Sequence, residues 1–395
     1  MSSQSTELLG HDRESELDVI RKEARALARS FPLEYWREHD RSGEYPWEFV
    51  RAFAERDWLG IMMPEEYGGM GLGITEASIL MQEISGSGAG QSGSSAVHFY
   101  IFPPGPIIKH GPEEMKREYL PLLAQGKLLM AFAVTEPNAG TDTSRITTRA
   151  ERREGRWVIN GQKIWTSNAQ NAQKILLLTR TSPRDEENPL AGMTLFFTDL
   201  DRERCTVRRI DKLGRECVDS NEVFIDDLIA TDDQIVGEVD NGFRCLLDGI
   251  NPERICVAME AVGIGRCALD LAARYANTRI VFGRPIGVNQ AIAHPLADAW
   301  ARLEAAELLA LKAASLYDAG KSCAVEANAA KYLASEAGFA ATDAAMQTHG
   351  GLGYAKEYHI ERLWREARLW KLAPISQEMV LNFLSQRALH LPKSY

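Results

Sequence analysis

The sequence contains no long uninterrupted apolar segment and no excess of positive charge. Its 395 residues include 45 Lys and Arg against 55 Asp and Glu, a formal net charge of −10. A protein that covers nucleic acid needs clustered Lys and Arg to displace phosphate counterions, so the net charge argues against a broad nucleic-acid-binding face. No apolar run reaches the roughly 20 residues that a transmembrane helix needs. We therefore expect neither nucleic acid nor membrane among the partners.

Metal-binding and disulfide motifs are also missing. The chain has six cysteines, none in a Cys-x-x-Cys pair and none beside a histidine at metal-ligand spacing. We expect reduced thiols that pack as small apolar groups, no metal site, and a cytoplasmic location. The polar opening MSSQSTELLGHDRESELD lacks the apolar core of a signal peptide, which favours the same compartment.

Helical periodicity dominates the first third of the chain. Apolar residues of one early segment that share a helical face are Leu17, Ile20, Ala24, Leu27 and Phe31. Gly- and Pro-rich stretches such as MPEEYGGMGLG and YIFPPGPI interrupt the helical patterns. We expect a polar tail over residues 1–12 and an N-terminal helical domain over residues 13–130.

The pattern changes to short β-type runs at residue 131. RWVINGQKIWTS, KILLLTRT, MTLFFTDL and NEVFIDDLI are rich in branched and aromatic residues. The pair Asn160-Gly161 is a signal of a hairpin turn. We therefore expect a central β domain, barrel-like, over residues 131–241.

Long helical patterns return over residues 242–395, where we expect a C-terminal four-helix bundle. Small residues recur at helical spacing there, which allows close helix packing. The members of this stripe are Leu303, Ala306, Ala310 and Ala313. AGKS, residues 319–322, resembles the end of a P-loop but lacks the required earlier glycine, so we expect a loop between helices.

In the segment INPERICVAMEAVG, residues 250–263, the acidic Glu253 and the basic Arg254 directly follow a proline. Proline is tolerated in a first helical turn, so we expect Glu253 and Arg254 in such a turn. An acid there suits the helix dipole. A carboxylate in a dry pocket would instead serve as a general base, and the local pattern leaves both interpretations open.

Two segments of the β region carry polar groups suited to a planar heterocycle. AFAVTEPNAGTDTS, residues 131–144, offers backbone N–H groups and hydroxyls in a small space, although a structural turn explains it equally well. In KIWTSN, Trp165 could lie against a flat ring while Thr166 or Ser167 bonds its heteroatoms; a buried core Trp is the competing interpretation.

Two segments of the helical region suit a phosphate. ANTRIVFGRPIGVNQ brings Arg279 and Arg284 to a helix end, where they could clamp a pyrophosphate or simply face solvent. AMQTHGGLGY ends a helix in three glycines within four residues, which permits close backbone approach to a phosphate or only stops the helix.

Four motifs resemble, in their order, those of the flavin-dependent acyl-CoA dehydrogenases. They are VTEPNAGTD, KIWTSN, RIVFG followed by Gln290, and QTHGGLGY. The resemblance covers nearly the whole chain. It implies the helical, β and helical domains described above, and FAD held between the β domain and the bundle against a second subunit. A homodimer or homotetramer active in fatty acid metabolism follows by similarity.

The resemblance also implies roles for individual residues. Residues at positions that surround the isoalloxazine are Phe132, Val134, Thr135, Gly140, Thr141, Trp165, Thr166 and Ser167. Residues at positions that reach the partner's adenosine diphosphate portion are Arg279, Phe282, Gln290, Gln347, Gly350 and Gly351. Ile375 and Gln377 complete the cofactor set. Residues expected near the acyl-CoA are Thr141, Asn251, Glu253 and Arg254.

The implied reaction is α,β-dehydrogenation of an acyl-CoA thioester to the trans-2-enoyl-CoA, with hydride passing to flavin N5 and electrons to an electron-transferring flavoprotein. Much of the family takes its catalytic base from a C-terminal segment, but the matching stretch LAPISQEMV has Ala373 at that position. A branch that includes isovaleryl-CoA and long-chain dehydrogenases has a glutamate where this chain has Glu253. Glu253 is therefore the expected base, with Glu260 and Glu378 as substitutes.

Two alternatives remain open from the sequence. A flavin oxidase or monooxygenase of the same fold would use oxygen, and Ala373 also permits an FAD- or CoA-binding protein without a base. Glu136, in the TEP loop, is expected to be structural.

Overall fold

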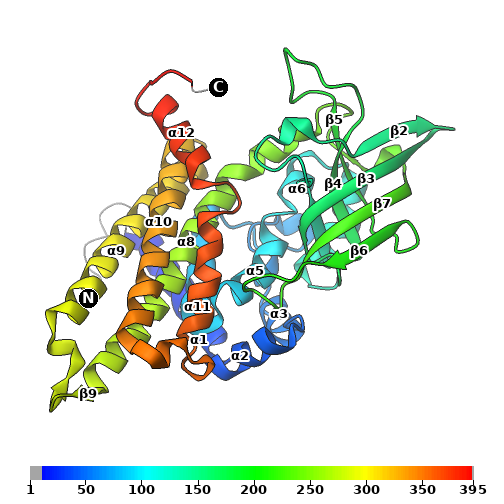
Figure 1. Cartoon of the computed structure of the whole chain (residues 1–395). Coiled ribbons are helices and arrows are strands. Elements are labelled where there is room, and N and C mark those ends of the chain that lie inside the picture. The colour runs from blue at the N-terminus through cyan, green and yellow to red at the C-terminus, as the bar shows by residue number, and fades with distance from the viewer. Residues whose placement is uncertain (1–10, 394–395) are drawn as a thin grey trace.

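The computed structural model describes residues 11–393 and has three regions in chain order. Figure 1 shows the long helices of the C-terminal bundle on one side, the β domain on the other, and the N-terminal helices packed between and below them. The expected order of a helical, a β and a second helical region is confirmed.

The N-terminal region consists of helices joined by short turns. Its bounds are α1 (His11–Arg29), α2 (Leu33–Ser42), α3 (Trp47–Ala54), α4 (Ile74–Ile84), α5 (Gly90–Ile101), α6 (Gly105–His110) and α7 (Glu113–Ala124). A π-helical turn, Ser85–Ala89, joins α4 to α5. The predicted apolar face of the first helix points inward, since Leu17, Ala24 and Leu27 are buried.

The β domain is an eight-stranded sheet. Its strands are β1 (Met130–Ala133), β2 (Arg149–Arg153), β3 (Arg156–Ser167), β4 (Lys174–Arg180), β5 (Met193–Asp199), β6 (Cys205–Arg209), β7 (Ser220–Ala230) and β8 (Ile235–Val236). The order is β6-β7-β3-β1-β4-β5-β8, and β2 pairs with β3 and β4. β4 and most of β5 are buried, as their nearly continuous apolar sequences require.

The hairpin turn predicted at Asn160-Gly161 was wrong. β3 runs straight through these residues, and the chain reverses earlier, at Glu154-Gly155, where both residues have positive φ. Gly161 instead lies at a bulge in the pairing of β3 with β7. The Asn160 side chain bonds Asp227 on β7, so tertiary contacts override the local turn preference.

The C-terminal region is built on three long helices. Its elements are α8 (Gly242–Thr278), the hairpin β9 (Ile280–Val281) and β10 (Arg284–Pro285), α9 (Gln290–Asp318), α10 (Ala324–His349), α11 (Ile360–Ala367) and α12 (Gln377–Arg387). The predicted small-residue stripe of α9 is buried. α8 also packs closely on α4, because a Cβ at Gly263 would lie 2.3 Å from the Gln82 carbonyl oxygen.

The expected position of Glu253 in a first helical turn was wrong. α8 begins at Gly242 and continues through Pro252, so Glu253 lies well inside a 37-residue helix. The hydrogen bond that Pro252 cannot donate is one among many along α8, and packing of this helix against α4 and α10 compensates its loss. The helix-dipole explanation for Glu253 therefore no longer holds, because that effect is confined to the terminal turns.

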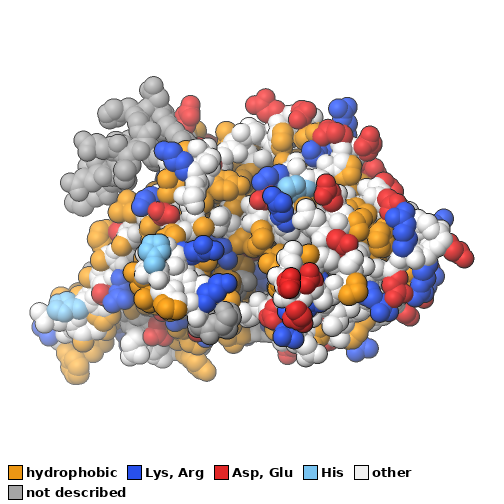
Figure 2. Space-filling view, turned by 90° about the horizontal axis from the view of Figure 1, so that it is seen from above, with side chains coloured by type: hydrophobic (Ala, Val, Ile, Leu, Met, Phe, Trp, Pro, Cys, Tyr) orange, Lys and Arg blue, Asp and Glu red, His pale blue; other side chains and the backbone are white. Residues whose placement is uncertain are grey.

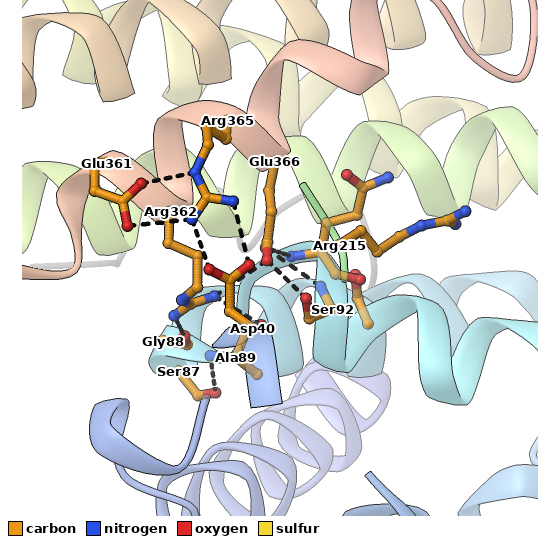
Figure 3. A network of polar contacts seen from close by, with 12 residues as sticks. Asp40, Ser87, Gly88, Ala89, Ser92, Arg215, Glu361, Arg362, Arg365 and Glu366 are labelled. Carbon is orange, nitrogen blue, oxygen red and sulfur yellow. Dashed lines mark hydrogen bonds and ion pairs between the residues drawn. The ribbon is translucent and has the colours of Figure 1, made fainter. Parts of the chain in front are cut away.

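A buried carboxylate joins the two helical regions at the start of α5 (Figure 3). Glu366 of α11 accepts hydrogen bonds from the Gln91 and Ser92 backbone N–H groups and from the Ser92 hydroxyl. Arg362 forms an ion pair with Glu366 and donates to the Gly88 carbonyl at 2.5 Å. An anion at a helix N-terminus meets unpaired N–H donors, so this contact fixes where α5 begins.

All six cysteines are unpaired and buried, as predicted. Between residues 11 and 393 no helix is long and apolar enough to cross a membrane. In the same part of the chain no three His, Cys, Asp or Glu side chains form a group that could hold a metal ion.

We predict that Glu366→Gln strongly destabilises the protein. The amide cannot accept the same hydrogen bonds, and it leaves the buried Arg362 guanidinium without its carboxylate, which costs about 3 to 5 kcal/mol. The shift of the urea unfolding midpoint measures this. Glu38→Gln is the matched control, since Glu38 pairs with Arg41 on the exposed surface of α2 and should leave the midpoint unchanged. Equal effects of the two substitutions would contradict the assignment.

Candidate active site

The β1 and β3 ends form one polar and aromatic surface. Phe132 and Ser167 are direct antiparallel neighbours, which brings the two motifs predicted for a planar heterocycle together. Trp165 has φ +61° and is 56 % exposed, so it is not the core residue that the competing interpretation required. A bulky residue in the left-handed region is uncommon and strained, and such strain occurs preferentially at functional sites.

The loop after β1 is held by a buried ion pair. Glu136 accepts from the Thr147 and Thr148 backbone N–H groups and from Lys163 at 2.9 Å. Burial alone would raise the pKa of Glu136, but the Lys163 ammonium and the hydrogen bonds outweigh it and hold the pKa at about 2. Lys163 also donates to the Val134 carbonyl, so this pair fixes the backbone on which Val134 and Thr135 lie. This geometry supports a structural role for Glu136.

The residues of this surface fit a flavin ring. The Thr166 hydroxyl and both polar atoms of the Asn168 side chain are buried without a hydrogen-bond partner. No atom lies within 4 Å of a Cβ built on Gly140, which leaves open space beside the loop that includes Thr141. An exposed indole, unpartnered polar groups and open space beside a glycine are the features that a flat polar heterocycle requires.

The residues predicted for the adenosine diphosphate portion lie elsewhere. Arg279 and Gln290 flank the β9–β10 hairpin, and Phe282 lies in its turn, at the end of the bundle remote from the β domain (Figure 1). Phe282 is 99 % exposed with φ +52°. The exposed residues Gln347, Gly350 and Gly351 lie at the same end, because Tyr275 of α8 stacks on His349 of α10. One chain therefore does not bring the two halves of the predicted FAD site together.

Ile375 and Gln377 lie where the chain enters α12. The Ile375 carbonyl accepts a hydrogen bond from Lys331 of α10 at 2.8 Å, and Gln377 is buried with an unpartnered amide nitrogen. Ala373 precedes them and carries no functional group. The structure thus offers no carboxylate at position 373.

Glu253 lines a cavity of about 300 Å³ between α5, α6, α8 and α9. The other residues of this cavity are mostly apolar, including Phe102, Ile108, Gly249, Cys256 and Tyr317. From above, the surface is visibly hollowed between the bundle and the β domain (Figure 2). A carboxylate in an apolar cavity is poorly solvated, which is the condition for an effective general base.

Burial raises the pKa of Glu253 to about 7, although the His98 and Arg254 charges act in the opposite direction. Two of the other predicted substrate residues, Asn251 and Arg254, are its neighbours on α8, whereas Thr141 lies in the loop after β1. Arg254 contacts the Asn251 amide oxygen at 3.5 Å, and the Arg254 Nε is buried without a partner.

The two substitute bases lie in different surroundings. Glu260 is fully buried and its Oε1 atom lies 2.7 Å from Nδ1 of His98 on α5. Burial alone would lower the pKa of His98, but Glu260 outweighs it and raises that pKa above its usual value. Glu378 is exposed in the first turn of α12, and hydrogen bonds from the Glu378 backbone and Ser376 lower its pKa. Glu253 is thus the only one of the three that lines the cavity.

A second cavity, of about 350 Å³, lies between α2 and α11 and is lined almost entirely by charged side chains. Its acids are paired, because Glu38 bonds Arg41 while Asp40 and Glu361 both bond Arg365. It serves as an electrostatic contact between helices rather than a place for an apolar acyl group.

Comparison with known proteins identifies the family. Models of the N-terminal, middle and C-terminal domains of acyl-CoA dehydrogenase match residues 14–127, 131–228 and 240–389. An acyl-CoA dehydrogenase of Mycobacterium tuberculosis is 39% identical over 386 residues, covering 96% of this chain and 97% of its own. The chain belongs to the acyl-CoA dehydrogenase family and is an oxidoreductase of that class.

Two further relatives bear on function. The CarC subunit of the caffeyl-CoA reductase-Etf complex from Acetobacterium woodii is 34% identical, with 90% of this chain and 93% of the subunit covered. The structure of a glutaryl-coenzyme A dehydrogenase in complex with glutaryl-CoA superposes with a TM-score of 0.91 at 28% identity, covering 100% of this chain and 98% of that one.

Sequence reasoning missed His98 and Arg215. Both are buried polar residues, His98 in the apolar run SSAVHFYIF and Arg215 in the loop DKLGRECVDS after β6. A histidine within an apolar run was the only signal for His98, and the polar sequence around Arg215 gave none. Their partners, Glu260 and the Ser167 hydroxyl, lie 162 and 48 residues away along the chain.

We predict that Glu253→Gln does not lower stability and raises it above pH 7. The folded-state pKa of about 7 exceeds the usual pKa of a glutamate, so the folded protein binds the proton more tightly than the unfolded chain does. This contribution to stability is complete at a pH below the usual pKa and is lost as the pH rises through 7. The neutral amide avoids the loss, with a ceiling of about 3 kcal/mol. Melting temperatures at pH 6 and pH 8.5 measure it, with the exposed Glu378→Gln as control. A pH-independent difference would refute the raised pKa of Glu253.

Proposed function

We propose that the protein dehydrogenates an acyl-CoA thioester between its α- and β-carbons to give the trans-2-enoyl-CoA, with Glu253 as the base. The observation that carries this proposal is the position of Glu253 on the wall of an apolar cavity with a pKa of about 7. FAD, bound in the family, supplies the acceptor for the β-hydrogen as hydride. Glu253 takes the α-proton, so that both hydrogens leave the substrate.

The tuned acidity of Glu253 supports this role. A carboxylate at its usual pKa is a weak base, whereas a group that titrates near the working pH combines proton affinity with a large deprotonated fraction. Its location inside α8 leaves no helix-terminus function for the side chain. Ala373 and the exposed Glu378 leave no nearer competitor on the C-terminal segment.

We further propose that each FAD lies between two chains. The surface around Trp165 and Ser167 would hold the isoalloxazine, with Val134, Thr135 and Gly140 from the adjoining loop. Arg279, Phe282, Gln290 and the glycines after α10 would reach the adenosine diphosphate of the partner's cofactor. The nearly complete exposure of Phe282 at the far end of the bundle supports this arrangement.

Electrons would leave through an electron-transferring flavoprotein. The CarC relative is a subunit of an Etf complex, and its match covers 90% of this chain. A steady-state assay with such a flavoprotein as acceptor, compared with oxygen, distinguishes this proposal from the oxidase alternative.

We predict that Glu253→Gln abolishes reduction of the flavin by substrate while leaving FAD content unchanged. Loss of a general base costs about 100- to 10,000-fold in rate. In the wild type the reductive rate should rise with pH through about 7, because only the deprotonated Glu253 accepts the proton, and it should fall about tenfold per pH unit below that value. Anaerobic stopped-flow absorbance of the flavin measures both effects.

Glu378→Gln is the control, since that carboxylate is exposed and should leave the rate and its pH profile unchanged. A near-normal rate in Glu253→Gln would transfer the role to Glu260. A flavin that no acyl-CoA reduces in the wild type would contradict the dehydrogenase assignment.

We predict that Arg279→Ala lowers FAD retention and weakens the dimer. The substitution removes a charge-assisted phosphate contact, worth roughly 1.5 to 3 kcal/mol, that the partner chain would supply. Flavin absorbance per chain and light scattering after gel filtration measure the two effects. Arg302→Ala, which removes an exposed arginine of α9, is the control. A monomer with a full complement of FAD would exclude the shared site.

A further inference from the structure

The facing surfaces of α5 and α8 change from apolar to polar as they lead inward from the Glu253 cavity. Phe102, at the end of α5, packs against Gly249 where a Cβ would lie 3.3 Å from its ring. One turn further along α5, His98 contacts Glu260 of α8. His98, Ser95 and Gln91 follow one another at spacings of three and four residues, so they share one face of α5.

This polar surface ends at Arg215. Its guanidinium donates to the hydroxyls of Ser95 at 3.3 Å, Ser167 at 3.1 Å and Ser220 at 3.0 Å. Arg215 therefore bridges α5 to the strand end that carries Trp165 and Ser167. Only 8 % of the residue is exposed, and it is held at φ +59°. A left-handed backbone at a buried arginine costs energy and so points to a functional requirement.

Arg215 lacks the partner that a buried arginine normally has. Its hydrogen-bond partners are neutral hydroxyls, its Nε has none, and no carboxylate of residues 16–393 forms an ion pair with it. Burial lowers its pKa despite the more distant charges of Asp219, Glu366 and Glu260. A planar guanidinium binds a carboxylate in a bidentate manner far more strongly than it binds hydroxyls.

Other polar atoms near Arg215 are also unpartnered. Both side-chain atoms of Gln91 and the Oε2 atom of Glu260 are buried without a hydrogen bond. Each such atom left dry costs about 1 to 3 kcal/mol. A purely aliphatic acyl chain would satisfy none of them.

The nearby carboxylates bond other groups and do not form an ion pair with Arg215. Glu366 is engaged by Ser92, Arg362 and the start of α5, and Figure 3 shows Arg215 beside this group. Asp219 accepts from Asn221 and from the Gln170 backbone. Glu260 is paired with His98.

We propose that the acyl group carries a carboxylate at its end remote from the thioester and that Arg215 binds it. Gln91 and Ser95 would donate the remaining hydrogen bonds. This inference rests on the proposed function, because it places the thioester at Glu253 and the acyl chain between α5 and α8. The substrate class is therefore the CoA monothioester of a dicarboxylic acid.

Binding is tested on the FAD-loaded enzyme with CoA thioethers, which lack the carbonyl and cannot be dehydrogenated. S-alkyl-CoA and S-(ω-carboxyalkyl)-CoA of equal chain length are compared by calorimetry for chains of four to six carbons. We expect the carboxylated member to bind at least about tenfold more tightly at one or more of these lengths. Equal binding, or preference for the methyl-ended member at every length, overturns the proposal and indicates that water alone satisfies the polar groups.

Arg215→Met should abolish this preference by weakening the carboxylated ligand about 10- to 100-fold without weakening the methyl-ended one. Arg215→Lys should restore part of it, and Arg208→Met, at an exposed arginine of β6, is the charge-matched control. A preference that persists in Arg215→Met overturns the proposal. The wild-type comparison remains decisive if a variant does not fold.

The corresponding thioesters separate the two proposals. If the wild type binds the carboxylated thioether preferentially but no thioester reduces the flavin, Arg215 stands as a carboxylate site and the dehydrogenation falls. If thioesters reduce the flavin through Glu253 but no carboxylate preference exists, only the inference about Arg215 falls.

Discussion

The contact between Glu366 and the start of α5 determines the geometry of the site. This carboxylate belongs to α11 and accepts a hydrogen bond from the Gln91 backbone N–H, 275 residues earlier in the chain. Arg362 forms an ion pair with it and donates a hydrogen bond to the Gly88 carbonyl of the π-helical turn. The contact fixes the start of α5 and thereby the positions of Ser95, His98 and Phe102 against α8. The cavity that Glu253 lines exists because α5 and α8 are held in this register.

Two buried carboxylates and one half-buried carboxylate, Glu253, illustrate how surroundings assign different roles to one functional group. Glu136 has an ammonium and several donors, stays ionised, and shapes a loop. Glu366 has a guanidinium and a helix start, and joins domains. Glu253 has an apolar cavity and no close donor, so its charged form is costly and its pKa rises to about 7. Stability selects the first two environments, whereas the third is costly for folding and suits proton transfer.

Three of the non-glycine residues held at positive φ lie around the same region. Trp165, Asn168 and Arg215 all have positive φ, and the Ser167 hydroxyl connects the first pair to the third. One small volume thus holds the expected isoalloxazine surface, the inner end of the α5–α8 interface and a cation without a carboxylate. Such a combination favours a bound ligand, because an exposed indole and a buried guanidinium without a carboxylate both cost free energy of folding.

The sequence by itself determined the order of the three regions, because apolar periodicity and the positions of glycine and proline depend on local geometry. It also singled out the polar loops around Thr135 and Trp165, and Glu253 as the proposed base, through motif order and the alanine at position 373. Only the tertiary structure decided that Asn160-Gly161 lies within a strand, since pairing with two neighbouring strands outweighs a two-residue turn preference. Likewise it placed Glu253 deep inside a continuous helix, where packing on α4 and α10 overrides the stop signal of a proline. The surroundings that set the pKa of Glu253, and the meeting of Arg215 with Ser95 and Ser167, depend on contacts between residues far apart in the chain. Desolvation and charge pairing act through space, so no local pattern carries them.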